Sequence, residues 1–219
     1  MSRLDRQLLL ERIVASQILA VVRAPDIPDA VALSAALAAG GIPVVELTFT
    51  TPDLPRHLRA CAETADDLGV IVGAGTVLRA DDARAAVDAG AQFLVTPGLG
   101  PDAATIVATG HDAEVPVFLG ALSPSEVMTA FALGSDAVKI FPASRFGPAY
   151  LKDLRGPFPD VPLVPSGGVN ETNARDYLAA GASVVCAGSN VVASAVVAAG
   201  DWATITAAAT AFRDSLTAS

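Results

Sequence analysis

The chain is poor in aromatic residues, cysteine, histidine and lysine. Aromatic residues make up 5% of its 219 residues, with 2 cysteines and 2 histidines. Cys61 and Cys186 lie far apart in sequence, so we expect reduced, inert thiols and neither a disulfide framework nor a thiolate metal cluster. His57 and His111 have no partner at the spacing of metal ligands. We therefore expect both at the surface, and no metal site.

Long apolar runs are also missing. Asp, Arg, Gly or Pro interrupts every apolar stretch before it reaches the roughly 18 residues that a membrane helix needs. The opening MSRLDRQLLLERIVAS alternates charge with leucine and has no cleavage site after a hydrophobic core, which predicts an amphipathic helix. A formal net charge of -9 removes the usual attraction to nucleic acid or an acidic membrane. We expect a cytoplasmic protein whose anionic ligands are held by local groups.

Apolar content, by contrast, is high enough for a large core. Hydrophobic residues make up 52% of the chain, which predicts one domain over residues 1–219. Short β-rich runs alternate with helix-length segments, and a glycine often precedes the next run, as in AAGGIPVVEL and AAGASVVCAGS. The predicted strands lie near 18–23, 44–48, 70–73, 93–96, 115–119, 137–141, 161–165 and 184–187. Helix starts are expected at Asp26, Thr51, Asp81, Pro101, Ser123 and Asn170.

Strands that alternate with helices predict a parallel sheet, and eight such units fit a closed ring. The fold class is therefore α/β, a (β/α)8 TIM barrel with an extra N-terminal helix near 3–15 and a last helix near 201–216. An open doubly wound sheet is the competitor. No G-x-G-x-x-G follows the first strand, and an open sheet of eight strands would need covered edges that the sequence does not indicate.

Lys139 is the strongest chemical signal, because it lies inside the apolar run DAVKIFPA. Strand alternation places Lys139 and Phe141 on one face and Val138 and Ile140 on the other, and both faces look buried. Burial disfavours a charged ammonium and yields the free amine that attacks carbonyls. A snorkelling lysine or a buried salt bridge is the alternative.

In a TIM barrel the reactive groups lie at the carboxyl ends of the strands. There the sequence places polar residues and glycines: Arg23, Glu46, Thr48, Thr76, Thr96, Pro97, Lys139, Ser166, Gly167, Gly168, Gly188 and Ser189. Glu46 can point into the barrel mouth and transfer protons beside the amine of Lys139. Charge compensation of Lys139 or Arg23 is the simpler alternative for this carboxylate. The glycines of PSGGVN and AGSN predict a phosphate held on backbone N–H groups.

The chain resembles the class I 2-keto-3-deoxy-6-phosphogluconate (KDPG) and 4-hydroxy-2-oxoglutarate aldolases. VVRAP, GGIPVVELTFTTPD, GAGTV, AGAQFLVTPG, KIFPAS, GPFPDVPLVPSGGVN and AGS occur in the order and spacing of that family. The resemblance implies that Lys139 is the Schiff-base lysine and Glu46 the proton-transfer residue. It also implies a pyruvyl pocket with Thr76, Pro97 and Phe141, a phosphate site with Gly167, Gly168 and Ser189, and an anion contact from Arg23.

By the same resemblance the reaction is reversible cleavage of KDPG to pyruvate and glyceraldehyde 3-phosphate, by a homotrimer without metal or organic cofactor. Two positions depart from the family pattern. Thr50 stands where some members have an arginine that binds the keto-acid carboxylate, and Leu119 replaces a proline before Gly120. We keep Thr50 and Ser166 as substrate-binding candidates and Gly188 as a phosphate-binding candidate.

Other functions remain open at this point. The 6-phosphogalactonate-type aldolases share the lysine, and KIFPAS-FGP-Y also resembles their sixth segment, while 4-hydroxy-2-oxoglutarate is another possible substrate. A sugar-phosphate isomerase or epimerase would use Lys139 only as an electrostatic group. A non-catalytic sugar-phosphate binding barrel would use neither Lys139 nor Glu46 for chemistry.

Overall fold

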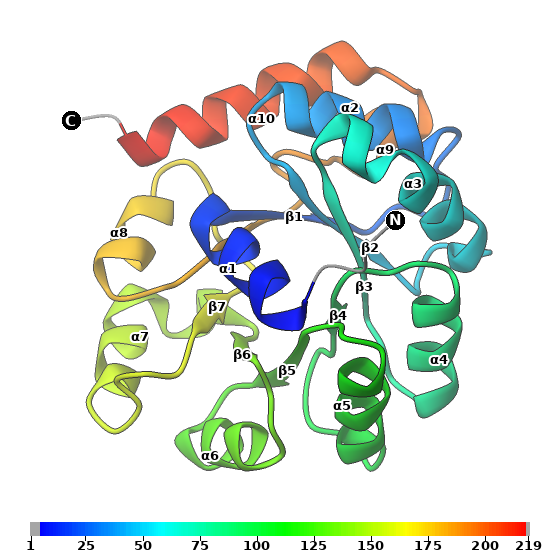
Figure 1. Cartoon of the computed structure of the whole chain (residues 1–219). Coiled ribbons are helices and arrows are strands. Elements are labelled where there is room, and N and C mark those ends of the chain that lie inside the picture. Colours follow the sequence, from blue (N-terminus) through cyan, green and yellow to red (C-terminus); the bar gives the residue numbers. More distant parts are fainter. Residues whose placement is uncertain (1–4, 218–219) are drawn as a thin grey trace.

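Eight parallel strands form a nearly closed barrel in the computed structural model, which describes residues 5–217 (Figure 1). The strands are β1 (Ile18–Val22), β2 (Val44–Thr48), β3 (Ile71–Gly75), β4 (Leu94–Val95), β5 (Val117–Ala121), β6 (Ala137–Ile140), β7 (Leu163–Pro165) and β8 (Val185–Ala187). Their order is β7-β6-β5-β4-β3-β2-β1-β8. Between β7 and β8, the two ends of this order, the Ser183 N–H donates to the Leu163 carbonyl at 2.9 Å. The barrel prediction is confirmed, and the open-sheet alternative is wrong.

Helices surround this ring and cover its outer face (Figure 1). They are α2 (Ala30–Ala39), α3 (Leu54–Leu68), α4 (Ala80–Asp88), α5 (Ala103–Asp112), α6 (Pro124–Ala132), α7 (Gly147–Arg155), α8 (Ala174–Ala179), α9 (Ser194–Ala198) and α10 (Trp202–Thr217), with a short 3-10 helix, η1 (Ala143–Arg145), after β6. The larger apolar cluster lies between strands and helices. The last helix packs beside α2, where the Thr206 hydroxyl donates to the Ala36 carbonyl at 3.0 Å.

The extra helix α1 (Arg6–Ser16) crosses the centre of the ring in Figure 1. Its buried residues Leu9 and Ile13 belong to the same apolar cluster as the inward-facing strand residues. The helix therefore closes one end of the barrel, because without it these interior side chains would meet water. The predicted helix is confirmed from residue 6 onward, and residues 3 and 4 of that prediction lie outside the described residues.

Helix starts were predicted with mixed success. Ser123 accepts from the Glu126 N–H and Glu126 accepts from the Ser123 N–H, so the capping box of α6 begins where expected. The start of α2 at Asp26 is wrong, since Asp29 is the N-cap and accepts from the Ala32 N–H at 2.9 Å. Two prolines in the sequence APDIPDA keep the segment before Asp29 out of the helix.

His57 is buried, so its expected surface position is wrong. It lies on the inner face of α3 with Leu54, Leu58 and Cys61, at the three- and four-residue spacing of a packed helix face. Burial lowers the pKa of His57, and neighbouring Arg56 lowers it further. Its imidazole is therefore part of the helix packing and not a solvent-facing group.

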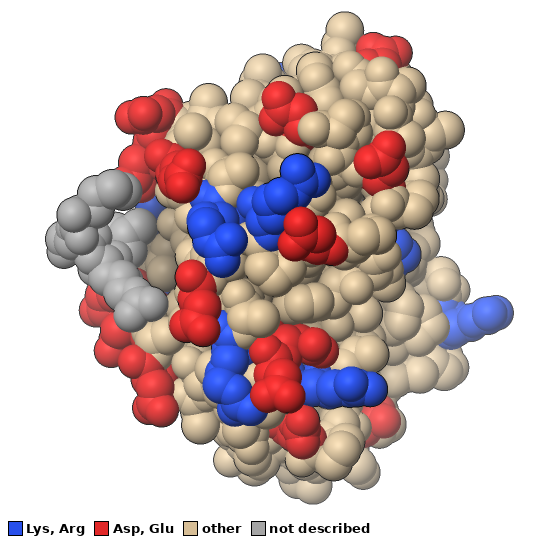
Figure 2. All heavy atoms as spheres, turned by 90° about the vertical axis from the view of Figure 1, so that its right-hand side faces the viewer, with Lys and Arg blue, Asp and Glu red and all other residues tan. Residues whose placement is uncertain are grey.

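The surface mixes charges of both signs. On the face that Figure 2 shows, Lys and Arg side chains are interspersed with Asp and Glu, without a continuous basic area. Within residues 5–217 no helix is both long enough and apolar enough to cross a membrane.

The barrel interior gives a stability prediction. Phe93 and Phe118 stack there with ring centroids 5.9 Å apart, and both rings are fully buried. Phe118→Ala should lower the free energy of unfolding by about 3–5 kcal/mol, because it leaves a cavity that the ring of strands cannot close. Leu8→Ala, at a position that is 43% exposed, is the control and should change it by less than about 0.5 kcal/mol. Equal effects in chemical denaturation would contradict this interior.

Candidate active site

Lys139 and Glu46 meet inside the barrel. Lys139 lies on β6 and Glu46 on β2, and Lys139 Nζ is 3.4 Å from Glu46 Oε1. Their side chains are 4% and 1% exposed, so bulk water does not screen the contact. Strand alternation predicted this meeting. Arg23, the other cation considered for Glu46, instead donates to the Thr76 hydroxyl at 3.3 Å.

The second oxygen of Glu46 is left over. Among the described residues, Glu46 Oε2 is buried without a hydrogen-bond partner. Strand β3 makes room for the carboxylate, because a Cβ atom on Gly75 would lie 1.9 Å from Glu46 Oε1. An unpaired buried carboxylate oxygen is costly in a finished core. This oxygen can accept a hydrogen bond from a bound molecule or from a water.

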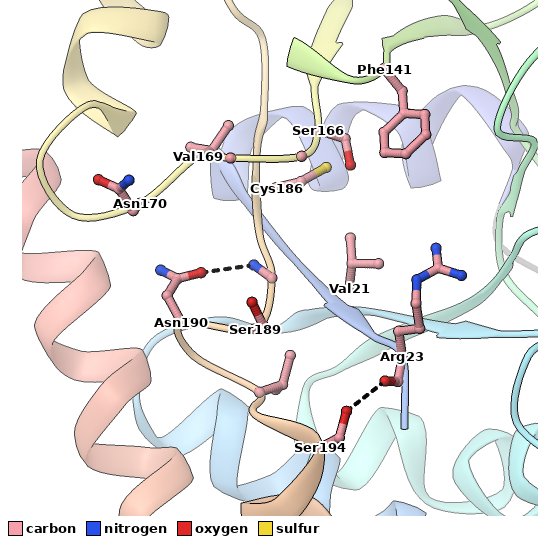
Figure 3. Close-up of a pocket in the computed structure, with 14 residues that line it drawn as sticks. Val21, Arg23, Phe141, Ser166, Val169, Asn170, Cys186, Ser189, Asn190 and Ser194 are labelled. Carbon is pink, nitrogen blue, oxygen red and sulfur yellow. Dashed lines mark hydrogen bonds between the residues drawn. The ribbon is translucent and has the colours of Figure 1, made fainter. Parts of the chain in front are cut away.

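A cavity of about 470 Å³ lies near this pair, and Figure 3 shows the residues that line it. It is bounded by the ends of β1, β6, β7 and β8 and by the loops that follow them, and its walls are Val21, Arg23, Phe141, Ser166, Gly167, Gly168, Val169, Asn170, Cys186, Gly188, Ser189, Asn190, Val192 and Ser194. Seven predicted binding residues therefore line one cavity: Arg23, Phe141, Ser166, Gly167, Gly168, Gly188 and Ser189. The volume suits a small metabolite.

Phe141 and Cys186 connect the cavity to the charged pair. Lys139 Nζ lies 5.8 Å from the centroid of the Phe141 ring, and that ring lines the cavity. Burial raises the pKa of the Cys186 thiol to about 12; Lys139 lowers it, Glu46 raises it and the hydrogen bond with Ser166 lowers it. The thiol is thus close enough to Lys139 and Glu46 for both charges to change its pKa. The amine therefore lies close behind the cavity wall, although neither Lys139 nor Glu46 is itself a wall residue.

One end of the cavity has glycines and backbone N–H groups without an acceptor. Gly167 and Gly168 have φ values of 87° and 83°, a region open to glycine, and a Cβ on Gly168 would lie 2.4 Å from the Ser144 Cβ. Within residues 5–217, the N–H groups of Gly167, Gly168 and Ser189 donate to no other group of the chain. Free backbone N–H groups that line a cavity favour a phosphate or carboxylate. The Gly188 N–H is different, since it donates to Asn190 Oδ1 at 3.1 Å.

The remaining predicted residues lie away from the cavity wall. Thr76 has a left-handed backbone with φ 55° and is tied to the cavity through Arg23. Thr50 is exposed and pairs with the Thr48 hydroxyl at 2.7 Å, so its side chain serves the β2 loop. Pro97 is held by Thr96, which donates to the Gly98 carbonyl at 2.8 Å. The same Thr96 accepts from the Gly120 N–H at 2.9 Å, so the loop after Leu119 packs against the Pro97 loop.

Sequence reasoning missed seven residues of the cavity wall, of which Asn170, Cys186, Asn190 and Ser194 are polar or carry a thiol. Cys186 was interpreted as an inert thiol, although its place at the end of a strand was a signal that it lines the mouth. Asn190 and Ser194 gave no signal, because loop side chains have no periodicity. The Ser194 hydroxyl donates to the Arg23 carbonyl at 2.9 Å and so ties the β8 loop to the β1 loop. No cluster of three or more metal-ligating side chains occurs in the part of the chain that the structure describes.

A family model and several sequence relatives identify one family. The family model described as KDPG and KHG aldolase matches residues 9–208. A 2-dehydro-3-deoxy-phosphogluconate aldolase of Pseudomonas aeruginosa is 40% identical over 192 residues, which cover 87% of this chain and 84% of that protein. A KDPG aldolase structure from Legionella pneumophila, with pyruvate captured as a covalent carbinolamine intermediate, is 32% identical with a TM-score of 0.83, covering 96% and 98% of the two chains. A structure described as native KDPGal is 27% identical with a TM-score of 0.83, covering 91% and 94%.

The burial of both cysteine side chains gives a testable prediction. Both cysteines are free and buried, and burial raises the pKa of Cys61 as well. Burial raises the pKa of Cys186, so its thiol stays protonated and unreactive near neutral pH. In Cys61→Ser protein, Cys186 should therefore react with an aromatic disulfide reagent only after unfolding. Rapid reaction of the native variant, read from absorbance, would contradict this.

Proposed function

The chain belongs to the family of KDPG and KHG aldolases, and we propose that it is a Schiff-base aldolase that cleaves KDPG to pyruvate and glyceraldehyde 3-phosphate. The observation that carries the proposal is the buried contact of Lys139 Nζ with Glu46 Oε1 at 3.4 Å, next to a cavity that has free backbone N–H groups at one end. A barrel core gains nothing from burying an amine and a carboxylate, since apolar residues of similar size are usually as stable. The pyruvate carbinolamine of the Legionella pneumophila relative supports the same chemistry.

The first proposed step is attack of the neutral Lys139 amine on the C2 carbonyl carbon of the substrate. Transfer of the ammonium proton to Glu46, at 3.4 Å, frees the lone pair, and Glu46 passes this proton to the carbonyl oxygen as the C–N bond forms. A second proton moves from the nitrogen, through Glu46, to the hydroxyl group, so that Glu46 ends as a carboxylate. The carbinolamine then loses water and becomes an iminium.

Carbon–carbon cleavage follows from the iminium. Glu46, directly or through a water molecule, removes the proton of the C4 hydroxyl, and the C3–C4 bond breaks as glyceraldehyde 3-phosphate forms. The electron pair of that bond moves to the iminium nitrogen and gives an enamine. Protonation of C3 by the same carboxyl group and hydrolysis of the imine release pyruvate. These steps are proton transfers and imine chemistry, so the proposed mechanism requires neither a metal nor an organic cofactor.

The two ends of the substrate match the two ends of the site. We place the phosphate at the N–H groups of Gly167, Gly168 and Ser189, with Gly188 in the same loop, where no lysine or arginine is needed to hold it. The pyruvyl end lies toward Lys139, against Phe141, with Ser166 on the cavity wall and with Thr76 and Pro97 from the neighbouring strand ends. Arg23 is the proposed partner of the carboxylate, because Thr50 turns its hydroxyl to Thr48.

Two related substrates are the second candidates. The likeness to the native KDPGal structure and the KIFPAS-FGP-Y segment favour the epimer 2-keto-3-deoxy-6-phosphogalactonate, whereas the KHG part of the family description favours 4-hydroxy-2-oxoglutarate. Turnover of the two phosphorylated C4 epimers, compared under one set of conditions, distinguishes the first alternative. We propose the gluconate epimer because the more similar relative from Pseudomonas aeruginosa is named for it.

Substitution of the two charged residues tests the mechanism. Lys139→Arg keeps a cation but cannot form an imine, so pyruvate release from KDPG should fall below detection. Glu46→Gln should lower kcat by about 10²–10⁴-fold, the usual contribution of a positioned acid–base group. Lys152→Arg is the matched control, because Lys152 lies on α7 and is exposed. It should retain near wild-type activity.

The outcomes distinguish the proposal from its competitors. Substantial turnover by Lys139→Arg would contradict imine chemistry and favour an isomerase-like barrel in which the cation acts only electrostatically. A Glu46→Gln variant with unchanged kinetics would remove the proposed acid–base group.

For assembly we propose a homotrimer that works in the cytoplasm. Large apolar side chains on the outer surface support self-association: Met128 and Phe131 of α6 are 60% and 57% exposed. Light scattering should then return three times the 22.1 kDa mass of the chain. A mass of one chain at micromolar concentration would contradict the trimer.

A further inference from the structure

A single amide side chain joins the two loops that form the anion end of the cavity. Asn190, in the loop between β8 and α9, accepts from the Gly188 N–H at 3.1 Å. Its Nδ2 donates to Glu171 Oε1 at 3.0 Å, and Glu171 lies in the loop between β7 and α8. Figure 3 shows the Asn190 amide among the residues that line the cavity, with its hydrogen bond from the Gly188 N–H as a dashed line.

This contact has no substitute in the two loops. The β7–α8 loop is otherwise held by its own turn, in which Asn173 Nδ2 donates to the Gly168 carbonyl at 3.0 Å. The β8–α9 loop is held by its own turn too, since the Val191 and Val192 N–H groups both donate to the Gly188 carbonyl at 2.9 Å. Over residues 5–217, the bond from Asn190 to Glu171 is the only hydrogen bond between these loops.

We infer that Asn190 and Glu171 form a clasp that positions the phosphate-binding N–H groups and so sets the preference for phosphorylated substrates. The inference rests on the proposed function. Gly167 and Gly168 come from one loop and Ser189 from the other, so a phosphate can use all three donors only at a fixed separation of the loops. When the clasp holds the two loops in place before binding, phosphate binding loses less conformational entropy in ordering them. Asn190 acts through the backbone and is a positioning residue.

The chemistry of the two side chains fits this role. An amide has both a donor and an acceptor, so Asn190 can satisfy the Gly188 N–H and reach Glu171 at the same time. A carboxylate is a stronger acceptor than a neutral group and fixes which way the amide points. The negative charge of Glu171 by itself would weaken phosphate binding, because a carboxylate repels a phosphate dianion. The hydrogen bond and the charge can therefore be separated by substitution.

The experiment measures binding of inorganic phosphate by calorimetry at constant ionic strength, with the full-length protein. Asn190→Ala and Glu171→Ala both break the clasp and should each weaken phosphate binding about tenfold, the effect of one lost hydrogen bond to a charged group. Glu171→Gln keeps an acceptor at the same reach and should bind within about threefold of the wild type. Glu63→Ala, an exposed carboxylate on α3, is the control for net charge.

Kinetics on two substrates supply the second measurement. The clasp variants should raise KM for the phosphorylated substrate by about the same tenfold with little change in kcat. The ratio of kcat/KM for the phosphorylated substrate to that for 4-hydroxy-2-oxoglutarate should fall in the same proportion. The double variant Asn190→Ala/Glu171→Ala should be no weaker than Asn190→Ala alone, since that change already removes the bond to Glu171.

Three results would overturn the inference. The first is tighter phosphate binding by Glu171→Ala, which would mean that the charge of Glu171 dominates. The second is an unchanged phosphate affinity of Asn190→Ala. The third is a Glu171→Gln variant that binds phosphate as weakly as Glu171→Ala. Unaltered thermal midpoints confirm that the variants are folded. Phosphate binding needs no catalysis, so loss of the clasp effect and failure of the aldolase proposal give different results: the first appears in calorimetry, the second as no pyruvate release by the wild type.

Discussion

The contact between Lys139 and Glu46, at 3.4 Å and nearly out of reach of water, is the constraint on which the rest of the site depends. Each charge would be costly to bury alone, so both must be brought together by rigid elements. Strands β2 and β6 do this because the barrel holds their side chains at a common interior. Gly75 adds the space for the carboxylate, and a methyl group there would lie 1.9 Å from its oxygen.

The interior of the barrel is divided along its axis. Below the charged pair, Phe93 and Phe118 fill the ring and α1 closes its end with Leu9 and Ile13. Above it, the strand ends give way to the cavity and to glycines whose N–H groups are free. The apolar end therefore holds the strands in place, and the open end contains the candidate active site. A phosphate held by backbone N–H groups also suits a chain with a net charge of -9, since no excess of cations is needed.

The fold and the charged pair could be predicted because both follow from periodicity. Eight apolar runs between helices specify the barrel, and strand alternation turns Lys139 and Glu46 inward. His57 was misplaced although the spacing from Leu54 to Cys61 carried the signal of a buried face. The Asn190 clasp could not be predicted, because a hydrogen bond between two loops depends on their separation in space. The cavity wall shows the same division: most strand-end residues were found, with Cys186 the exception, whereas the loop residues Asn190 and Ser194 were not.

The most direct test of the account is the covalent one. Pyruvate and sodium borohydride, added together to the native protein, should reduce an imine and increase the protein mass by one reduced pyruvate. Peptide mass spectrometry should place that increase at Lys139, and Lys139→Arg protein should keep its mass. Wild-type protein that keeps its native mass after this treatment, or that is modified at Lys152 instead, would contradict the account.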